Sequence, residues 1–179
     1  MRARTTNLRP LPLMVLAVAF ALGGCGGSGP AANGPLRSGS PVPLSSNCAP
    51  DGRSVAFGFE QFTNYGHVTV TLDRVLLLHP HNQHLIGSYA VPGAVLVGVV
   101  YWPPRYPGMP STWKHRQRVH GFRLAPGKTF NMVLGVAPID ESRRATSQGM
   151  LVYYHDPSGR YVAKDHSANI IAAKAHQCD

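Results

Sequence analysis

The chain has 179 residues, 17 Lys+Arg against 8 Asp+Glu and a formal net charge of +9, a length that fits one domain with extensions. The cationic excess favours anionic partners, and eight acidic residues offer few candidates for general acid–base catalysis. No Gly-rich phosphate loop, Ser/His/Asp arrangement or paired-carboxylate signature stands out in the sequence, which argues against an enzyme.

The N-terminal segment has the pattern of a signal peptide. Three arginines within the first nine residues precede an apolar stretch of 12 residues, Leu11 to Leu22, and this order is typical of a secretory signal. Twelve residues rise about 18 Å as a helix, which is short of the roughly 20 residues that a bilayer span needs. We therefore predict that residues 1–24 are a signal peptide.

The motif Leu22-Gly23-Gly24-Cys25 closes this stretch and resembles the lipobox of bacterial lipoproteins. The resemblance implies a diacylglyceryl group on the Cys25 thiol, cleavage before it, and acyl chains such as palmitate that hold the protein at the extracytoplasmic face of the cell membrane. Each buried acyl CH2 contributes about 0.8 kcal/mol, so two or three chains anchor durably. The alternative is an ordinary secretory signal followed by a coincidental cysteine.

Processing changes the composition of the chain. Removal of residues 1–24 leaves 155 residues, with 14 Lys+Arg against 8 Asp+Glu and a charge near +6. Residues 25–47 are rich in Gly, Ser and Pro after the cysteine, and such a segment has too little apolar surface to offset the entropy of ordering. We predict a flexible, disordered tether at 25–47 and one domain at 48–179.

Two cysteines, Cys48 and Cys178, remain near the ends of that domain. Exported proteins meet an oxidising environment, so the pair predicts a disulfide. Closing about 130 residues would stabilise the fold by roughly 4 to 5 kcal/mol in the chain-entropy model. Two free thiols, or a thiol that shares a metal with His176, are the competing interpretations.

The domain shows a two-residue hydrophobic period. Val68, Val70 and Leu72 alternate with polar residues. In the same two-residue period, Phe130, Met132, Leu134 and Val136 alternate with Thr129, Asn131, Val133 and Gly135, as strands with one buried face do. Turn sequences containing Gly and Pro separate the runs. The expected strands lie near 53–60, 67–78, 84–90, 94–101, 118–124, 129–136, 148–155 and 160–175. Seven or eight short strands predict an all-β, antiparallel sandwich.

The turns of this domain resemble those of the immunoglobulin-like domains of bacterial surface lipoproteins. An Asn64-Tyr65-Gly66 turn leads into the strand at 67–78, and a Leu-x-Pro-Gly turn at 124–127 precedes the strand at 130–136. The chain departs from antibody-type domains because no Cys, Trp, Cys spacing joins the two sheets. The resemblance implies an immunoglobulin-like β-sandwich and, since one fold serves many functions, says little about activity.

Three histidines, His79, His81 and His84, form the densest ligand-like cluster. Imidazoles at i and i+2 on a strand face the same side, as a copper or zinc site requires. However, Pro80 distorts the strand and no carboxylate is near in sequence. A solvated polar loop is the competing interpretation, and the sequence predicts no cofactor.

A four-residue match to the Ser-x-x-Lys motif of penicillin-binding serine enzymes occurs at Ser111 to Lys114. That chemistry also needs a Ser-Asp-Asn element and a Lys-Thr-Gly strand. The sequence offers only a partial match to the second, at Lys128-Thr129-Phe130. We therefore expect no catalysis at Ser111.

The stretch from Tyr101 to Arg123 is basic and aromatic, and no acidic residue occurs between Arg74 and Ile139. Long loops of this composition bind acidic polymers or protein partners. The predicted binding residues are Trp102, Arg105, Trp113, Lys114, Arg116 and Arg118. Anionic lipid headgroups, envelope polymers or a protein are the expected partners, and nucleic acid is not. The alternative is that both tryptophans plug one end of the sandwich while the cations stay solvated.

Overall fold

The computed structural model describes residues 30–31, 33–39, 46–94, 96–105 and 111–178. The predicted signal peptide and the predicted lipidation site Cys25 lie outside these residues, as do 40–45 of the predicted tether and 106–110 of the basic stretch. Within the described ranges, no helix is both long and apolar enough to cross a membrane.

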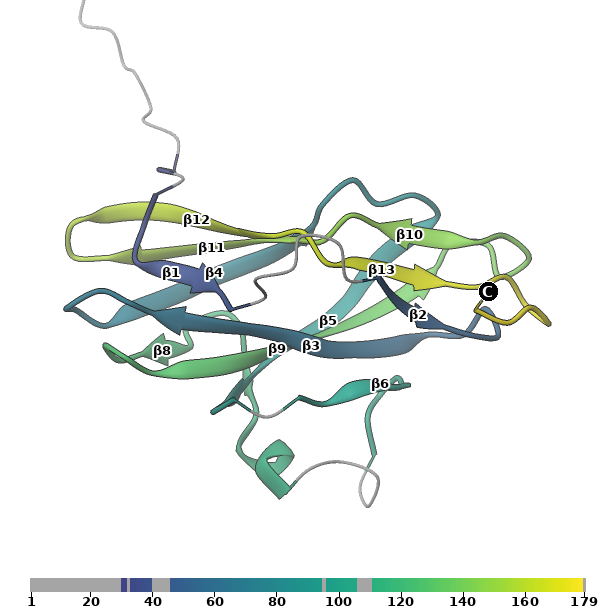
Figure 1. Ribbon diagram of the computed structural model, residues 1–179, viewed down its shortest axis with the longest axis horizontal. Coiled ribbons are helices and arrows are strands. Elements are labelled where there is room, and N and C mark those ends of the chain that lie inside the picture. Colours follow the sequence, from purple (N-terminus) through teal and green to yellow (C-terminus); the bar gives the residue numbers. More distant parts are fainter. Residues whose placement is uncertain (1–29, 32, 40–45, 95, 106–110, 179) are drawn as a thin grey trace, which may run out of the picture.

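The described residues form three sheets and one short 3-10 helix, η1, at Ser111–His115 (Figure 1). The six-stranded sheet contains β1 (Leu36–Ser38), β3 (Val55–Asn64), β9 (Thr129–Pro138), β5 (Gln83–Pro92), β7 (Gln117–Arg118) and β6 (Gly98–Tyr101). The four-stranded sheet contains β12 (Gly159–Asp165), β11 (Met150–Asp156), β4 (Val70–Leu77) and β8 (Arg123–Leu124). The three-stranded sheet contains β10 (Ala145–Ser147), β13 (Ala168–Ile171) and β2 (Ser46–Ala49).

The predicted all-β, antiparallel sandwich is confirmed. The strand pairs are antiparallel except β2 with β13, which run parallel. The structure has thirteen strands in the described ranges rather than seven or eight. The excess arises because several strands have only two to four residues, too few to produce a recognisable hydrophobic period.

The main core lies between the six-stranded sheet and the other two sheets. The predicted inner positions of β9, which are Phe130, Met132, Leu134 and Val136, are all fully buried. They share one cluster with residues of β4 and β11 such as Leu72, Val152 and Tyr154. Phe130 also stacks on Phe62 of β3, with ring centroids 5.5 Å apart. The two-residue period of β9 therefore identified its core-facing side.

The other side of β9 is buried as well. A second apolar cluster, formed by Ala56, Val91, Val97, Trp113 and Val133, lies on the outer face of the six-stranded sheet. Burial on both faces is usual for a central strand that is covered by further chain. The segment that covers it here runs from β6 through η1 to β7, below the sheet in Figure 1.

Part of the predicted tether belongs to the domain. β1 pairs with the end of β3, and Leu36 is buried and donates its backbone N–H to the Tyr154 hydroxyl at 3.1 Å. Ala31 forms a parallel bridge with Tyr161 of β12. The prediction of a disordered tether is therefore wrong for these described residues, because Leu36 supplies an apolar anchor and both segments extend sheet edges that would otherwise lack partners.

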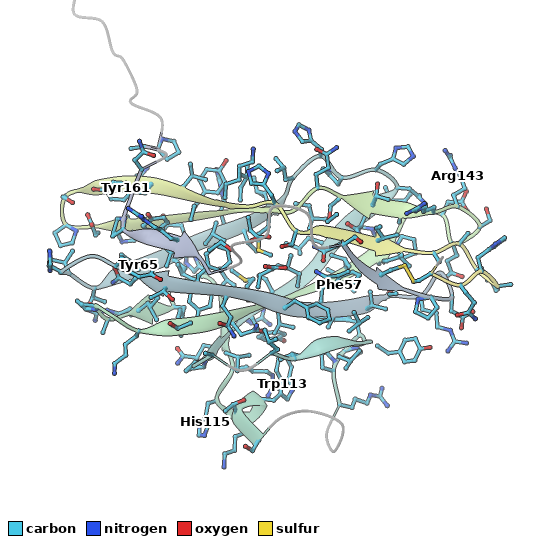
Figure 2. All side chains as sticks on the ribbon, viewed as in Figure 1. Phe57, Tyr65, Trp113, His115, Arg143 and Tyr161 are labelled. Atoms are coloured by element: carbon cyan, nitrogen blue, oxygen red, sulfur yellow. A yellow bond between two sulfur atoms is a disulfide. The ribbon has the colours of Figure 1, made fainter. Side chains whose placement is uncertain are left out.

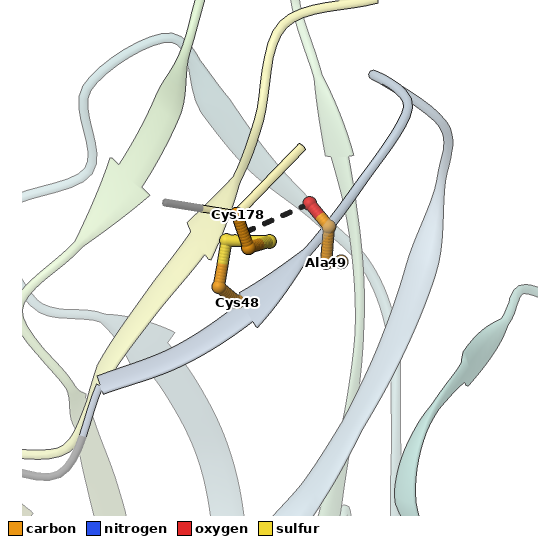
Figure 3. Close-up of a disulfide and its surroundings, with 3 residues drawn as sticks. All are labelled: Cys48, Ala49 and Cys178. Atoms are coloured by element: carbon orange, nitrogen blue, oxygen red, sulfur yellow. Dashed lines mark hydrogen bonds between the residues drawn. A yellow bond between two sulfur atoms is a disulfide. The ribbon is translucent and has the colours of Figure 1, made fainter. Parts of the chain in front are cut away.

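The predicted disulfide is confirmed. Cys48 of β2 is bonded to Cys178, 130 positions away, with Cα atoms 5.8 Å apart. Figure 3 shows the bridge beside the Ala49 carbonyl oxygen, 3.9 Å from Cys48 Sγ. Because β2 pairs with β13, the bridge fixes the C-terminal segment to an edge strand of the three-stranded sheet.

Removing this bridge should destabilise the domain strongly. We expect Cys48→Ser with Cys178→Ser to lower the free energy of unfolding by about 4 to 5 kcal/mol, because the open chain regains loop entropy. Urea denaturation followed by circular dichroism measures this difference. Cys25→Ser is the matched control and should leave the unfolding midpoint unchanged. An unchanged midpoint in the double variant would contradict the expectation.

Candidate functional site

Trp102 fixes the basic stretch to the six-stranded sheet. Gly87 of β5 and Gly135 of β9 lie directly opposite each other in the strand pair, and a Cβ atom at either position would overlap the Trp102 ring. The indole therefore occupies space that exists only because both residues are glycine. This contact explains the glycine in the middle of β9, where a residue without a side chain otherwise weakens a strand.

Trp113 makes the second attachment. It is 5% exposed, and its ring meets Tyr89 of β5 edge-on with centroids 5.5 Å apart. Trp102 stacks on the same Tyr89 ring at 5.8 Å, so the three aromatic rings form one group. Figure 2 shows Trp113 and His115 on the chain that lies beyond the sheet.

Two cations, Arg116 and Arg118, lie beside this aromatic group. The Arg116 guanidinium lies over the Trp113 ring at 4.6 Å and the Tyr89 ring at 5.6 Å, and donates to the Trp113 carbonyl oxygen at 3.2 Å. Arg118 lies opposite Tyr89 in the β5–β7 pair, and directly opposed residues project from the same face of a sheet. Lys114 and Arg105 are exposed on the same covering segment. We call Arg105, Lys114, Arg116 and Arg118 the basic face.

The basic face has no acidic partner in the part of the chain that the structure describes. The two ion pairs found there join Arg53 to Asp51 and His155 to Asp73. All four members of the basic face are exposed, so their charges act outward with little internal compensation. The outer face of the six-stranded sheet therefore carries a local positive potential.

A groove continues the basic face toward β6. It is lined by Arg53, Ser54, Val100, Tyr101, Trp102, Pro103 and Arg105. Tyr101 is 55% exposed, and the Arg53 guanidinium lies 5.4 Å from the centre of its ring. The exposed Tyr101 ring under the Arg53 guanidinium adds a flat contact surface to the charged one.

The structure separates the roles of the six predicted binding residues. It places the four cations at the surface, whereas Trp113 is buried and Trp102 is half-buried against glycine. The alternative that both tryptophans plug one end of the sandwich is wrong in its geometry, because they cover the outer face of a sheet. Trp113 therefore holds the segment in place and offers little surface to a partner.

The histidine cluster and the Ser-x-x-Lys match gain no support. His79, His81 and His84 are all exposed, and His81 exchanges backbone hydrogen bonds with Thr146. Among the described residues, no group of three or more His, Cys, Asp or Glu side chains is placed to hold a metal ion. Ser111 and Lys114 are both exposed on η1.

Sequence reasoning missed a buried carboxyl pair, Glu60 and Asp165, which are 4% and 2% exposed. The Ser38 hydroxyl donates to Asp165 Oδ2 at 2.6 Å, and the Ser167 backbone N–H donates to Oδ1 at 2.9 Å. Burial, and then the negative charge of Asp165, raise the pKa of Glu60 to about 7. A glutamate directly after the apolar run Val55 to Phe59 of β3 was the local signal, since its partner is distant in sequence.

Comparisons with known proteins identify no family. No protein-family model and no curated protein matches the chain. Among solved structures, the chain is similar to the ASH/PapD-like domain 7 of human CEP192, with 9% identity, a TM-score of 0.39, and 95% of this chain and 100% of that chain covered.

The chain is also similar to the VesB protease of Vibrio cholerae, with 12% identity, a TM-score of 0.40, and 78% of this chain covered. The matched part spans 32% of VesB. For the secreted serine protease VesC of the same organism, the identity is 10%, the TM-score is 0.30, and 70% of this chain and 21% of that chain are covered. Similarity at this level assigns no activity to the chain.

The carboxyl pair predicts a specific pH dependence of stability. Because the pKa of Glu60 rises from 4.5 to about 7 on folding, the native state binds the proton more tightly, and the free energy of unfolding should fall by about 3 kcal/mol as pH rises from 4.5 through 7. Glu60→Gln keeps a hydrogen-bond donor toward Asp165 and removes the titration. We therefore expect this variant to be the more stable protein above pH 7.

Chemical denaturation at several pH values measures the effect as a difference between variant and parent. The other glutamate of the chain, the exposed Glu141, provides the control, and Glu141→Gln should follow the parent curve. If Glu60→Gln also followed it, the proposed proton binding would be refuted.

Proposed function

We propose that this protein is a membrane-anchored, extracytoplasmic lipoprotein whose non-catalytic domain binds an acidic polymer of the cell envelope through the basic face. The observation that carries the proposal is the display of four cations, without acidic partners among the described residues, on a segment fixed by Trp102 and Trp113. A fixed scaffold reduces the entropy that the cations lose when they bind.

The chemistry of the basic face favours a polyanion over a protein partner. Stable protein interfaces centre on buried apolar or aromatic anchors surrounded by a polar rim. Here Trp113 is already buried inside the domain, and the Arg116 guanidinium lies over its ring. Repeated negative charges along a polymer match such a surface without requiring one deep pocket.

Two features support placement outside the cytoplasm. The Leu22-Gly23-Gly24-Cys25 motif resembles a lipobox, and the Cys48–Cys178 disulfide suits an oxidising compartment. Acylation at Cys25 would hold the domain at the membrane and raise its local concentration near envelope polymers.

The proposal predicts a loss of binding when the basic face is neutralised. Replacing Arg105, Lys114, Arg116 and Arg118 together by Gln should weaken retention on purified envelope polymer by about tenfold or more, and the parent protein's retention should fall as salt rises, because the attraction is electrostatic. Co-sedimentation at several salt concentrations measures both effects.

A charge-matched control uses four exposed cations elsewhere on the domain. The control variant replaces Lys128, Arg143, Arg144 and Lys174 by Gln and should bind like the parent. Equal retention of the two variants would show that net charge, rather than the basic face, governs binding. Retention of the first variant at the parent level would refute the proposed function.

A further inference from the structure

We propose that the outer face of the four-stranded sheet lies against the bilayer that holds Cys25, so that the basic face points away from that membrane. This inference rests on the proposed anchoring at Cys25. It follows from the place where the chain leaves the domain, from the short length of chain between that place and the cysteine, and from the side chains around it.

The N-terminal segment leaves the domain at the edge of β12. The Ala31 backbone N–H donates to the Arg160 carbonyl oxygen, and the Val162 N–H donates to the Ala31 carbonyl oxygen, both at 3.0 Å. Ala31 is only six positions after Cys25 in the sequence. Such a chain spans at most about 20 Å when fully extended, and a Gly-rich chain of that length averages about 13 Å end to end.

The basic face lies on the far side of the molecule from this attachment. The main core separates the four-stranded from the six-stranded sheet, and the segment carrying η1 covers the opposite face of the latter. In Figure 1, β12 and the start of the described chain lie at the top, whereas η1 lies at the bottom. Packed sheets are about 10 Å apart, and the covering segment adds a layer of similar depth.

These lengths determine the orientation. Contact of the basic face with the anchoring membrane would place Ala31 about 20 Å or more above the lipid, given two layers of about 10 Å each. A chain of six residues reaches that height only near full extension, at a large cost in conformational entropy. The opposite orientation places the β12 edge near the lipid and needs no stretching.

The outer face of the four-stranded sheet has the chemistry of a membrane-interface surface. We call Arg74, Tyr153, Arg160, Val162 and Lys164 the membrane face. Tyr153 lies between Val162 and Arg74 across three strands, and the Arg74 guanidinium is 4.5 Å from the centre of its ring. Tyrosine favours the headgroup region, and each nearby cation attracts anionic lipid by about 1 kcal/mol.

Acidic side chains near this surface are largely engaged. The Asp73 carboxylate is 2.7 Å from His155 Nδ1. Asp156 accepts hydrogen bonds from the Ser158 hydroxyl and from the backbone N–H groups of Ser158 and Gly159. The membrane face itself holds three exposed cations, Arg74, Arg160 and Lys164, and no acid. It therefore carries a net positive charge, with Tyr153 and Val162 among the cations. Anionic headgroups of the anchoring leaflet match this combination.

Intrinsic fluorescence can test the orientation, because the two tryptophans of the chain, Trp102 and Trp113, belong to the segment on the far side. The mature protein, acylated at Cys25, is placed in phosphatidylglycerol–phosphatidylcholine vesicles whose acyl chains carry bromine, which quenches tryptophan on contact. The parent emission should not change. Tyr153→Trp should lose about half of its added emission, because a tryptophan at that place sits at headgroup depth.

The matched control is Tyr101→Trp, an exposed aromatic position on the basic side. Its added emission should remain unquenched. Insertion of 20 Gly/Ser residues between Gly29 and Pro30 should reduce the quenching of Tyr153→Trp, because the longer chain releases the domain from the surface. Equal quenching at positions 101 and 153, or stronger quenching at 101, would overturn the inference.

Two further readouts separate this inference from the proposed function. Mass spectrometry reports whether Cys25 carries acyl chains, and an unacylated mature protein would overturn the anchoring and the orientation together. Retention on envelope polymer is measured on the same samples. Loss of quenching at position 153 with intact acylation and intact retention would overturn the orientation alone.

Discussion

The packing of Trp102 onto Gly87 and Gly135 is the contact on which the surface of this domain depends. Those glycines open a flat area across β5 and β9, and the indole fills it. Without that cover, apolar side chains such as Val91 and Val133 would face solvent, which invites aggregation. The half-buried Trp102 ring removes apolar surface of the sheet from water, so this contact contributes to stability as well as to shape.

The same contact determines what the surface can do. Because aromatic rings fix the covering segment, its cations occupy defined positions, and Arg116 is further oriented by Trp113 and Tyr89. The other side of the sandwich receives the N-terminal segment at β12. The proposed function therefore places attachment and recognition on opposite outer faces, which the main core between the sheets holds in a fixed relation.

The sequence predicted the features that have a local period or a small set of partners. The inner side of β9 and the cysteine pair were found in this way. It missed the outer burial of β9, because Val133 and Gly135 looked like solvent-facing positions until the covering segment was known. It missed β1 because three residues show no period, and it missed Glu60 with Asp165 because their proximity arises only from the tertiary pairing of β1, β3 and β12.

Substitution of Gly135 by Ala tests the central contact most directly. The added Cβ would overlap the Trp102 ring, so we expect a destabilisation of about 1 to 3 kcal/mol, red-shifted tryptophan emission and weaker polymer retention. Gly159→Ala, where a Cβ would meet Tyr161 at an ordinary 3.6 Å, should leave all three unchanged. Parent-like stability and emission in Gly135→Ala would contradict the account.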